Sequence, residues 1–185
     1  MDGFPAILDR WRGAADFARA YIRSMRLYYA FVTGIAGWIG VAFARFLYPQ
    51  SVSTVRSATV LTILFLSWGV NQIINDWLGL REDRINAPHR PMVNGELKPG
   101  AALAVTIGLL FMTSVITWFY LEPVALIPLI IGIMLNIVYE YAKGYGILGN
   151  IVFGLMISMC GLFGFLASGP MEMYFTKSRI SALLF

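Results

Sequence analysis

Long apolar runs separated by short polar segments dominate this chain. A helix that crosses a lipid bilayer needs about 20 mostly apolar residues. Five runs meet that requirement, at residues 27–47, 57–76, 101–120, 123–142 and 150–169. The pattern predicts an all-α integral membrane bundle of about five transmembrane helices. Residues 180–185 turn apolar again after a polar stretch, and we interpret them as the start of a sixth span.

The first 25 residues follow a different pattern. Apolar side chains recur there at spacings of three and four, as on one face of a helix, at Phe4, Leu8, Trp11, Ala15, Ala18, Ile22 and Met25. Charged residues lie between them, so the segment lacks the apolar core of a signal peptide. We predict an amphipathic helix over residues 1–25 at the membrane surface, as an anchor or as a gate, followed by one transmembrane domain over residues 26–185.

The composition agrees with a membrane protein. Hydrophobic residues make up 58% of the 185 residues and charged residues only 13%, whereas soluble domains carry about 25% charged residues. The net charge of +4 suits anionic lipid headgroups. Nucleic acid is not an expected partner, because no soluble segment has a basic stripe with interleaved aromatic residues.

Small residues inside the predicted spans indicate packing rather than chemistry. Glycines recur in the first and fifth spans, where they allow helices to approach closely, at Gly34, Gly37, Gly40, Gly154, Gly161 and Gly164. The single cysteine, Cys160, lies in an apolar run without a nearby histidine. We therefore expect Cys160 to be a packing residue rather than a nucleophile.

Lysine and arginine are distributed unevenly among the connecting segments. With the N-terminus in the cytoplasm, ten of these 14 residues fall on the cytoplasmic side, and the exceptions are Arg45, Arg56, Lys177 and Arg179. Cytoplasmic loops of membrane proteins carry such an excess. We therefore expect the N-terminus and the polar segment 75–100 to be cytoplasmic. The connections after the second and fourth spans then share that side, which brings residues 81–98 near residues 139–143.

Residues 75–91 concentrate carboxylates, amides and arginines beside a span. Charge in such a place is costly and indicates a functional site. Asp76 and Asp83 are two helical turns apart and share a face if the second helix continues to Asp83. Carboxylates and amides are ligands for Mg²⁺, and arginines bind phosphate. The segment therefore fits a magnesium diphosphate site. The alternative is a solvated loop with ordinary cytoplasmic arginines.

Two stretches resemble the UbiA superfamily of intramembrane prenyltransferases. Asn75-Asp76, Asp83-Arg84-Ile85-Asn86 and Arg90-Pro91 are similar in order and spacing to the first aspartate-rich motif of that family. Tyr139, Lys143 and Gly149-Asn150 resemble a second family segment. The resemblance covers roughly residues 20–185. It implies the first helices of a longer all-α fold.

The resemblance also implies a reaction and roles for the matching residues. The reaction would be Mg²⁺-dependent transfer of a prenyl group from an allylic prenyl diphosphate to an aromatic or lipid-like acceptor. The implied catalytic residues are Asp76, Asp83, Tyr139 and Lys143, of which the two aspartates would bind Mg²⁺. The implied substrate-binding residues are Asn75, Arg84 and Arg90.

Two departures from the family pattern leave other functions open. Gly79 stands where the family has its middle aspartate, and no aspartate follows Asp83, so the second aspartate-rich motif is absent. Glu140 is the one well-placed later carboxylate, and it either pairs with Arg90 or Lys143 or contributes to metal binding. The alternatives are a terpene cyclase of the same fold and a truncated, inactive membrane protein that binds lipid or a partner. We also expect the chain to continue in its gene or to associate with another protein.

Overall fold

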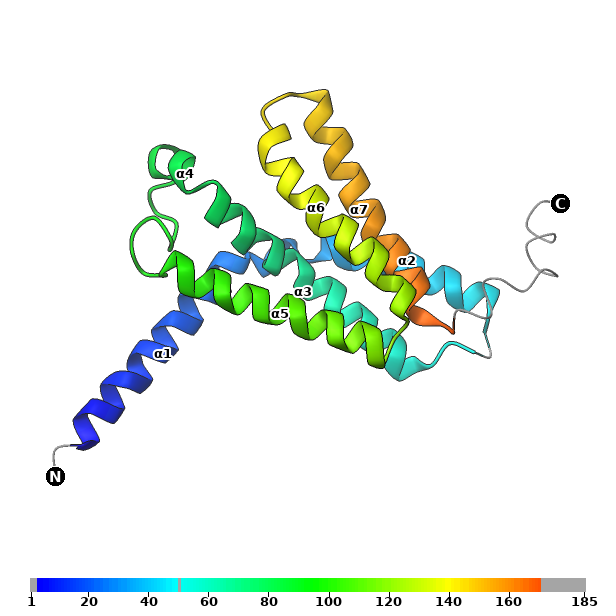
Figure 1. The fold of residues 1–185 in the computed structure, drawn as a ribbon, viewed down its shortest axis with the longest axis horizontal. Coiled ribbons are helices and arrows are strands. Elements are labelled where there is room, and N and C mark those ends of the chain that lie inside the picture. The colour runs from blue at the N-terminus through cyan, green and yellow to red at the C-terminus, as the bar shows by residue number, and fades with distance from the viewer. Residues whose placement is uncertain (1–2, 50, 171–185) are drawn as a thin grey trace.

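The computed structural model describes residues 3–49 and 51–170, with side chains from residue 13 onward. These residues form seven α-helices and two short 3-10 helices, with no strand among them (Figure 1). In chain order the elements are α1 (Gly3–Met25), η1 (Leu27–Tyr29), α2 (Phe31–Leu47), α3 (Thr54–Leu78), α4 (Leu80–Asn86), α5 (Pro99–Phe119), η2 (Pro123–Ala125), α6 (Leu126–Ala142) and α7 (Ile147–Ser168).

Four spans among the described residues are long and apolar enough to cross a membrane, which confirms four of the five predicted runs. They are Thr54–Leu78, Pro99–Phe119, Pro123–Ala142 and Ile147–Ser168. The run at 27–47 is more complicated, because the chain bends by 59° between Gly13–Tyr29 and Phe31–Leu47. If this bent pair is one span, the described residues contain five. The sixth span expected at 180–185 lies outside the described residues.

A separate break in the helix occurs at Arg26, before the bend between Tyr29 and Phe31. Arg26 has φ 48° and ψ 48°, and within the described part of the chain it is the only residue other than glycine with positive φ. A right-handed helix cannot continue through a left-handed residue. Helix α1 therefore ends at Met25, and the chain turns before η1.

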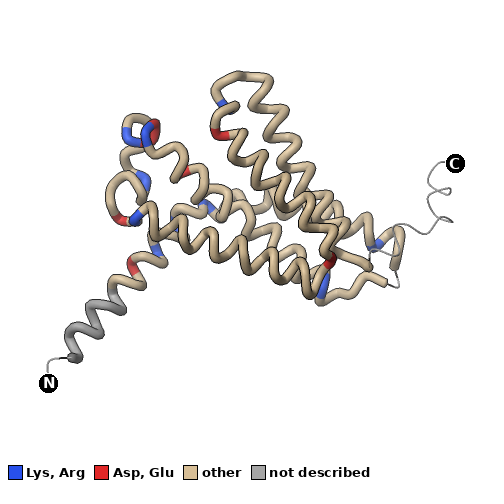
Figure 2. The backbone as a smooth tube through the Cα atoms, in the orientation of Figure 1, with Lys and Arg blue, Asp and Glu red and all other residues tan. Residues whose placement is uncertain are grey.

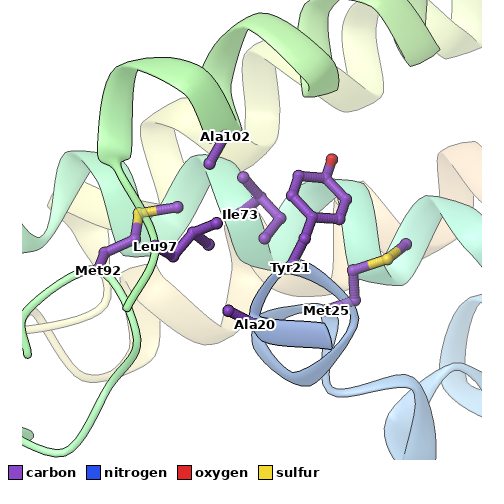
Figure 3. Packing of buried hydrophobic residues seen from close by; sticks show 7 residues of the cluster. All are labelled: Ala20, Tyr21, Met25, Ile73, Met92, Leu97 and Ala102. Atoms are coloured by element: carbon purple, nitrogen blue, oxygen red, sulfur yellow. The ribbon is translucent and has the colours of Figure 1, made fainter. Parts of the chain in front are cut away.

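Helix α1 is confirmed, and its C-terminal end packs on α3 and the start of α5. The side chains of this core gather where these elements meet (Figure 3), and they are Ala20, Tyr21, Met25, Ile73, Met92, Leu97 and Ala102. The Tyr21 hydroxyl also lies 2.8 Å from the Thr106 hydroxyl. Of the face predicted to meet the membrane, Ala15, Ala18 and Ile22 are exposed, whereas Met25 is buried in this core. That face therefore remains exposed over residues 15–22 but packs against the protein at the end of α1.

Helices α2 and α7 approach each other closely through glycines. A Cβ added to Gly40 would lie 2.0 Å from the carbonyl oxygen of Gly161, and one added to Gly164 would lie 2.3 Å from that of Gly37. Only glycine fits at such distances, so the packing role predicted for these residues is confirmed. Gly154 is an exception, because a Cβ there would meet nothing within 4 Å.

Cys160 takes part in packing, as predicted. It is partly buried against a core cluster formed by residues of α2, α3 and α7. Its thiol donates to the carbonyl oxygen of Met156 at 3.7 Å, one turn earlier in α7. Nothing in these contacts activates the sulfur as a nucleophile.

At one end of the bundle, Arg56 connects three elements. From the first turn of α3 it donates to Glu122, which precedes η2, at 2.9 Å, and to the Ala167 carbonyl near the end of α7, also at 2.9 Å. Both charged side chains are largely buried. We call this contact the Arg56 staple. Most other charged residues lie at the opposite end, around α4, the loop after it and the end of α6 (Figure 2).

Candidate active site

A cavity of about 240 Å³ opens at the charged end of the bundle, between the ends of α3 and α6 and the first half of α7. We call it the polar cavity. Its lining residues are Arg26, Trp68, Asn71, Gln72, Asn75, Asp76, Arg90, Asn136, Tyr139, Glu140, Lys143, Phe153 and Met156. Five of the seven predicted site residues are among them. The polar cavity also brings residues 81–98 and 139–143 together, as the predicted topology requires.

Asp76 is the central charge of this site. Its side chain is only 1% exposed, near the end of α3. Arg26 donates to its Oδ1 at 2.5 Å, and Arg90 approaches the same oxygen at 3.3 Å. Arg26 also donates to Gln72 at 2.6 Å. A buried carboxylate needs such partners, because its desolvation is otherwise uncompensated.

Asp83 joins the site through Arg90 rather than through helix register. The continuous helix from Asp76 to Asp83 was predicted conditionally, and the structure does not contain it, because α3 ends at Leu78 and α4 begins at Leu80. Gly79 lies at this junction, and glycine has a low helix propensity. Arg90 donates to both Asp76 and Asp83, so one guanidinium group holds the two carboxylates together.

Several buried polar atoms around the polar cavity have no hydrogen-bond partner among the described residues. They are Oδ1 of Asn75, Oδ2 of Asp76, Nε1 of Trp68 and both amide atoms of Asn136. Buried polar atoms are nearly always paired in folded proteins. Unpaired donors and acceptors gathered around one cavity indicate a polar ligand.

The oxygen atoms of this set fit Mg²⁺. Asp76 Oδ2 and Asn75 Oδ1 are hard oxygen donors without other partners. In the part of the chain that the structure describes, no group of three His, Cys, Asp or Glu side chains could hold a metal ion by itself. Mg²⁺ is usually bound through one or two carboxylates together with phosphate oxygens and waters. The site therefore suits a metal ion that arrives with a diphosphate.

Lys143 lies on the other wall of the polar cavity, directly after α6. It pairs with Glu140, one turn earlier, and lies 3.2 Å from Glu82 on α4. Burial would lower the pKa of Lys143, but the hydrogen bonds and charges of Glu140 and Glu82 outweigh burial and raise this pKa above its ordinary value. Lys143 is therefore a cation at neutral pH. Tyr139 lines the same wall and packs on Phe153, with 5.5 Å between ring centroids.

Arg84 is the predicted site residue that the structure places apart. It is exposed on α4 and is not among the residues that line the polar cavity. The lining residues outside the predicted set include three polar ones that no motif marked, and they are Arg26, Asn71 and Asn136. The two asparagines carried a signal, since amides are rare inside apolar runs. Arg26 carried none beyond being one of several arginines expected on the cytoplasmic side.

A second space, of about 430 Å³, lies on the other side of Arg26, Asp76 and Arg90, and these three residues line both. We call it the basic hollow. Its other lining residues are Arg23, Ser24, Tyr28, Tyr29, Ala87, His89 and Pro91. Positive side chains predominate in it, so it favours an anion.

Apolar helices long enough to cross a membrane, with carboxylates and arginines gathered at one end, suit an enzyme that acts within the membrane. Residues 30–185 match the model of the UbiA prenyltransferase family, so the chain belongs to this family. Its relatives include digeranylgeranylglyceryl phosphate synthases. The protein of this name from Methanosarcina barkeri is 30% identical over 156 residues, which cover 79% of this chain and 54% of the relative. The one from Thermococcus kodakarensis is 26% identical over 166 residues and covers 90% of this chain and 59% of the relative.

A solved structure agrees with these sequence matches. A digeranylgeranylglyceryl phosphate synthase described in membranes superposes with a TM-score of 0.70 at 26% identity. The match covers 85% of this chain and 56% of that one. The chain thus spans about half the length of the relatives it matches.

Proposed function

We propose that this chain carries the diphosphate-binding half of a membrane prenyltransferase that acts on an allylic prenyl diphosphate. The observation that carries the proposal is Asp76, a buried carboxylate with one oxygen bound to Arg26 and Arg90 and the other unpaired. The unpaired oxygen suits a metal ion, and the two arginines suit a phosphate. Asp76 and Arg90 lie within residues 30–185, which match the UbiA prenyltransferase family.

The residues would act on the bond between the allylic carbon and the diphosphate. That bond breaks with its electron pair going to the diphosphate, so negative charge develops on the leaving group. Arg90 and Lys143 both line the polar cavity and would stabilise that charge. Tyr139 and Phe153 would shield the allylic cation from water. Mg²⁺, when bound by Asp76 and Asn75 with Asp83 nearby, would neutralise further charge on the diphosphate.

The basic hollow suggests the class of acceptor. Its arginines would bind a phosphate headgroup, and the names of the relatives describe a glyceryl phosphate lipid that bears geranylgeranyl groups. We therefore propose a lipid acceptor with a phosphate headgroup and a free hydroxyl. The hydroxyl oxygen would form the new C–O bond to the allylic carbon and release its proton.

The test is a transfer assay with the full chain in lipid vesicles. Radiolabelled geranylgeranyl diphosphate is supplied with and without a prenylated glyceryl phosphate acceptor, and with and without Mg²⁺. We expect labelled ether lipid only when both are present. Asp76→Asn should lower product formation by about 100-fold, as loss of one charge-stabilising group does elsewhere. Arg84→Gln is the matched control and should change the rate by less than about twofold, because exposed charges contribute little.

Two results would contradict the proposal. Cyclic hydrocarbon formed without acceptor would indicate a terpene cyclase. No Mg²⁺-dependent binding of prenyl diphosphate, by correctly inserted protein, would indicate a membrane protein that binds only lipid or a partner.

A further inference from the structure

Position 79 is where the aspartate-rich segment of this chain lacks a carboxylate. Gly79 follows Asp76 by three residues, and its N–H still bonds to the Asn75 carbonyl at 2.8 Å, as in a helix. A side chain at position 79 would therefore lie one turn beyond Asp76, on nearly the same face. The glycine places nothing there.

Another carboxylate fills that space. A Cβ added to Gly79 would lie 2.8 Å from Oε1 of Glu140, and this is its nearest contact. Glu140 reaches the position from α6, and its side chain is only 8% exposed. The absence of a side chain at position 79 is what makes room for it. The carboxylate of Glu140, from α6, thus occupies the space that a side chain at position 79 would take.

We propose that Glu140 supplies to the diphosphate site the carboxylate that Gly79 cannot, and that it binds the metal ion jointly with Asp76. This inference rests on the proposed function, because it assigns a ligand within the same site. Both Glu140 and Asp76 line the polar cavity, and Asp76 Oδ2 is buried there without a partner. Glu82 differs in these respects, because it is 64% exposed and does not line the polar cavity.

Lys143 holds the side chain of Glu140 in place. The ammonium group of Lys143 bonds to Glu140 and so positions the carboxylate against α3. A lysine one turn along the same helix also balances the buried negative charge. If Glu140 served only as the counter-ion of Lys143, removing its carboxylate would free Lys143 for the diphosphate and would not weaken metal binding. This difference separates the two roles.

The experiment measures Mn²⁺ binding by electron paramagnetic resonance, using the full chain in detergent with inorganic diphosphate. Glu140→Gln should weaken Mn²⁺ binding by about tenfold or more, a typical loss when a metal site loses a supporting group. Glu82→Gln also removes a carboxylate that contacts Lys143, and it should change the affinity by less than about twofold. The double variant Gly79→Asp with Glu140→Ala should bind Mn²⁺ to within about threefold of the natural chain, whereas Glu140→Ala alone should not.

The outcomes are distinct. Natural-chain affinity in Glu140→Gln, or equal weakness in Glu140→Ala and the double variant, would overturn the assignment while leaving the proposed function intact. If the natural chain binds no Mn²⁺ with diphosphate, the proposed function fails and the assignment fails with it. Should Glu140→Gln not fold, the comparison between Glu140→Ala and the double variant decides alone.

Discussion

Asn136 lies in the apolar interior of α6, is 0% exposed, and has no partner for either amide atom among the described residues. A buried polar group left unpaired costs about 1–3 kcal/mol of stability. It lines the polar cavity beside Tyr139. We interpret Asn136 as a residue kept for binding at the expense of stability.

Replacing Asn136 with an apolar residue should therefore raise stability and weaken ligand binding. We expect Asn136→Leu to raise the free energy of unfolding by about 1 kcal/mol, because it removes an unpaired amide at similar volume. The same change should weaken binding of prenyl diphosphate. Thermal unfolding in detergent and a filter-binding assay measure the two effects. A destabilised variant would show that the amide has a structural partner in the folded protein.

Arg26 and Arg23 provide a matched pair at the end of α1. Arg26 bonds to buried Asp76, whereas Arg23 pairs with Glu96 and is 54% exposed. We expect Arg26→Ala to lower the free energy of unfolding by about 1.5–3 kcal/mol, as for loss of a hydrogen bond between charged groups. Arg23→Ala should change it by less than about 1 kcal/mol. If urea unfolding showed the same loss of free energy for both variants, the contact between Arg26 and Asp76 would contribute no more than the exposed pair, contrary to this prediction.

The predicted residues that the structure gathers around the polar cavity mostly belong to a local motif. Asn75, Asp76 and Arg90 lie within 16 residues of one another, and the resemblance to a family motif marked them. Arg26 is 50 residues from its partner Asp76. Such a contact depends on how the end of α1 packs on α3, and no local pattern predicted that packing.

At the scale of elements, the contact between α2 and α7 is the one most sensitive to side-chain size. Gly40→Leu would force the two helices apart, because its Cβ alone overlaps the Gly161 carbonyl. We expect a loss of about 1–3 kcal/mol in the free energy of unfolding, as for overpacking in other cores. Gly154→Leu on α7 is the control and should have little effect, since that position is open. Thermal unfolding in detergent gives the comparison.

The helices themselves were largely predictable, because an apolar run of about 20 residues has few other stable forms in a bilayer. The breaks between them were less predictable. The end of α3 at Leu78 and the end of α1 at Met25 each depend on one residue, Gly79 and Arg26 respectively. A single residue changes hydropathy little, so a pattern of apolar residues does not reveal such breaks.

At the scale of the whole molecule, the two ends of the bundle differ in charge (Figure 2). The positive-inside rule predicts that the end with α4 faces the cytoplasm. In a Cys160→Ala background, Arg84→Cys on α4 and Phe46→Cys at the end of α2 should react with a membrane-impermeant maleimide from opposite sides of sealed vesicles. Both positions are exposed. Labelling of Arg84→Cys only from the outside of right-side-out vesicles would show that the orientation is opposite to the one predicted.

The Arg56 staple fixes one end of the bundle and leaves the end with the polar cavity free to move. Its three elements are fixed to one another at the end far from the polar cavity. Opening and closing would then be rotations about this pivot, largest at α4 and at residues 143–146. We expect diphosphate to slow amide hydrogen exchange in those two segments and to leave Pro123–Ala125 unchanged. Arg56→Ala would loosen the pivot, so it should weaken ligand binding although the substitution lies at the opposite end of the bundle.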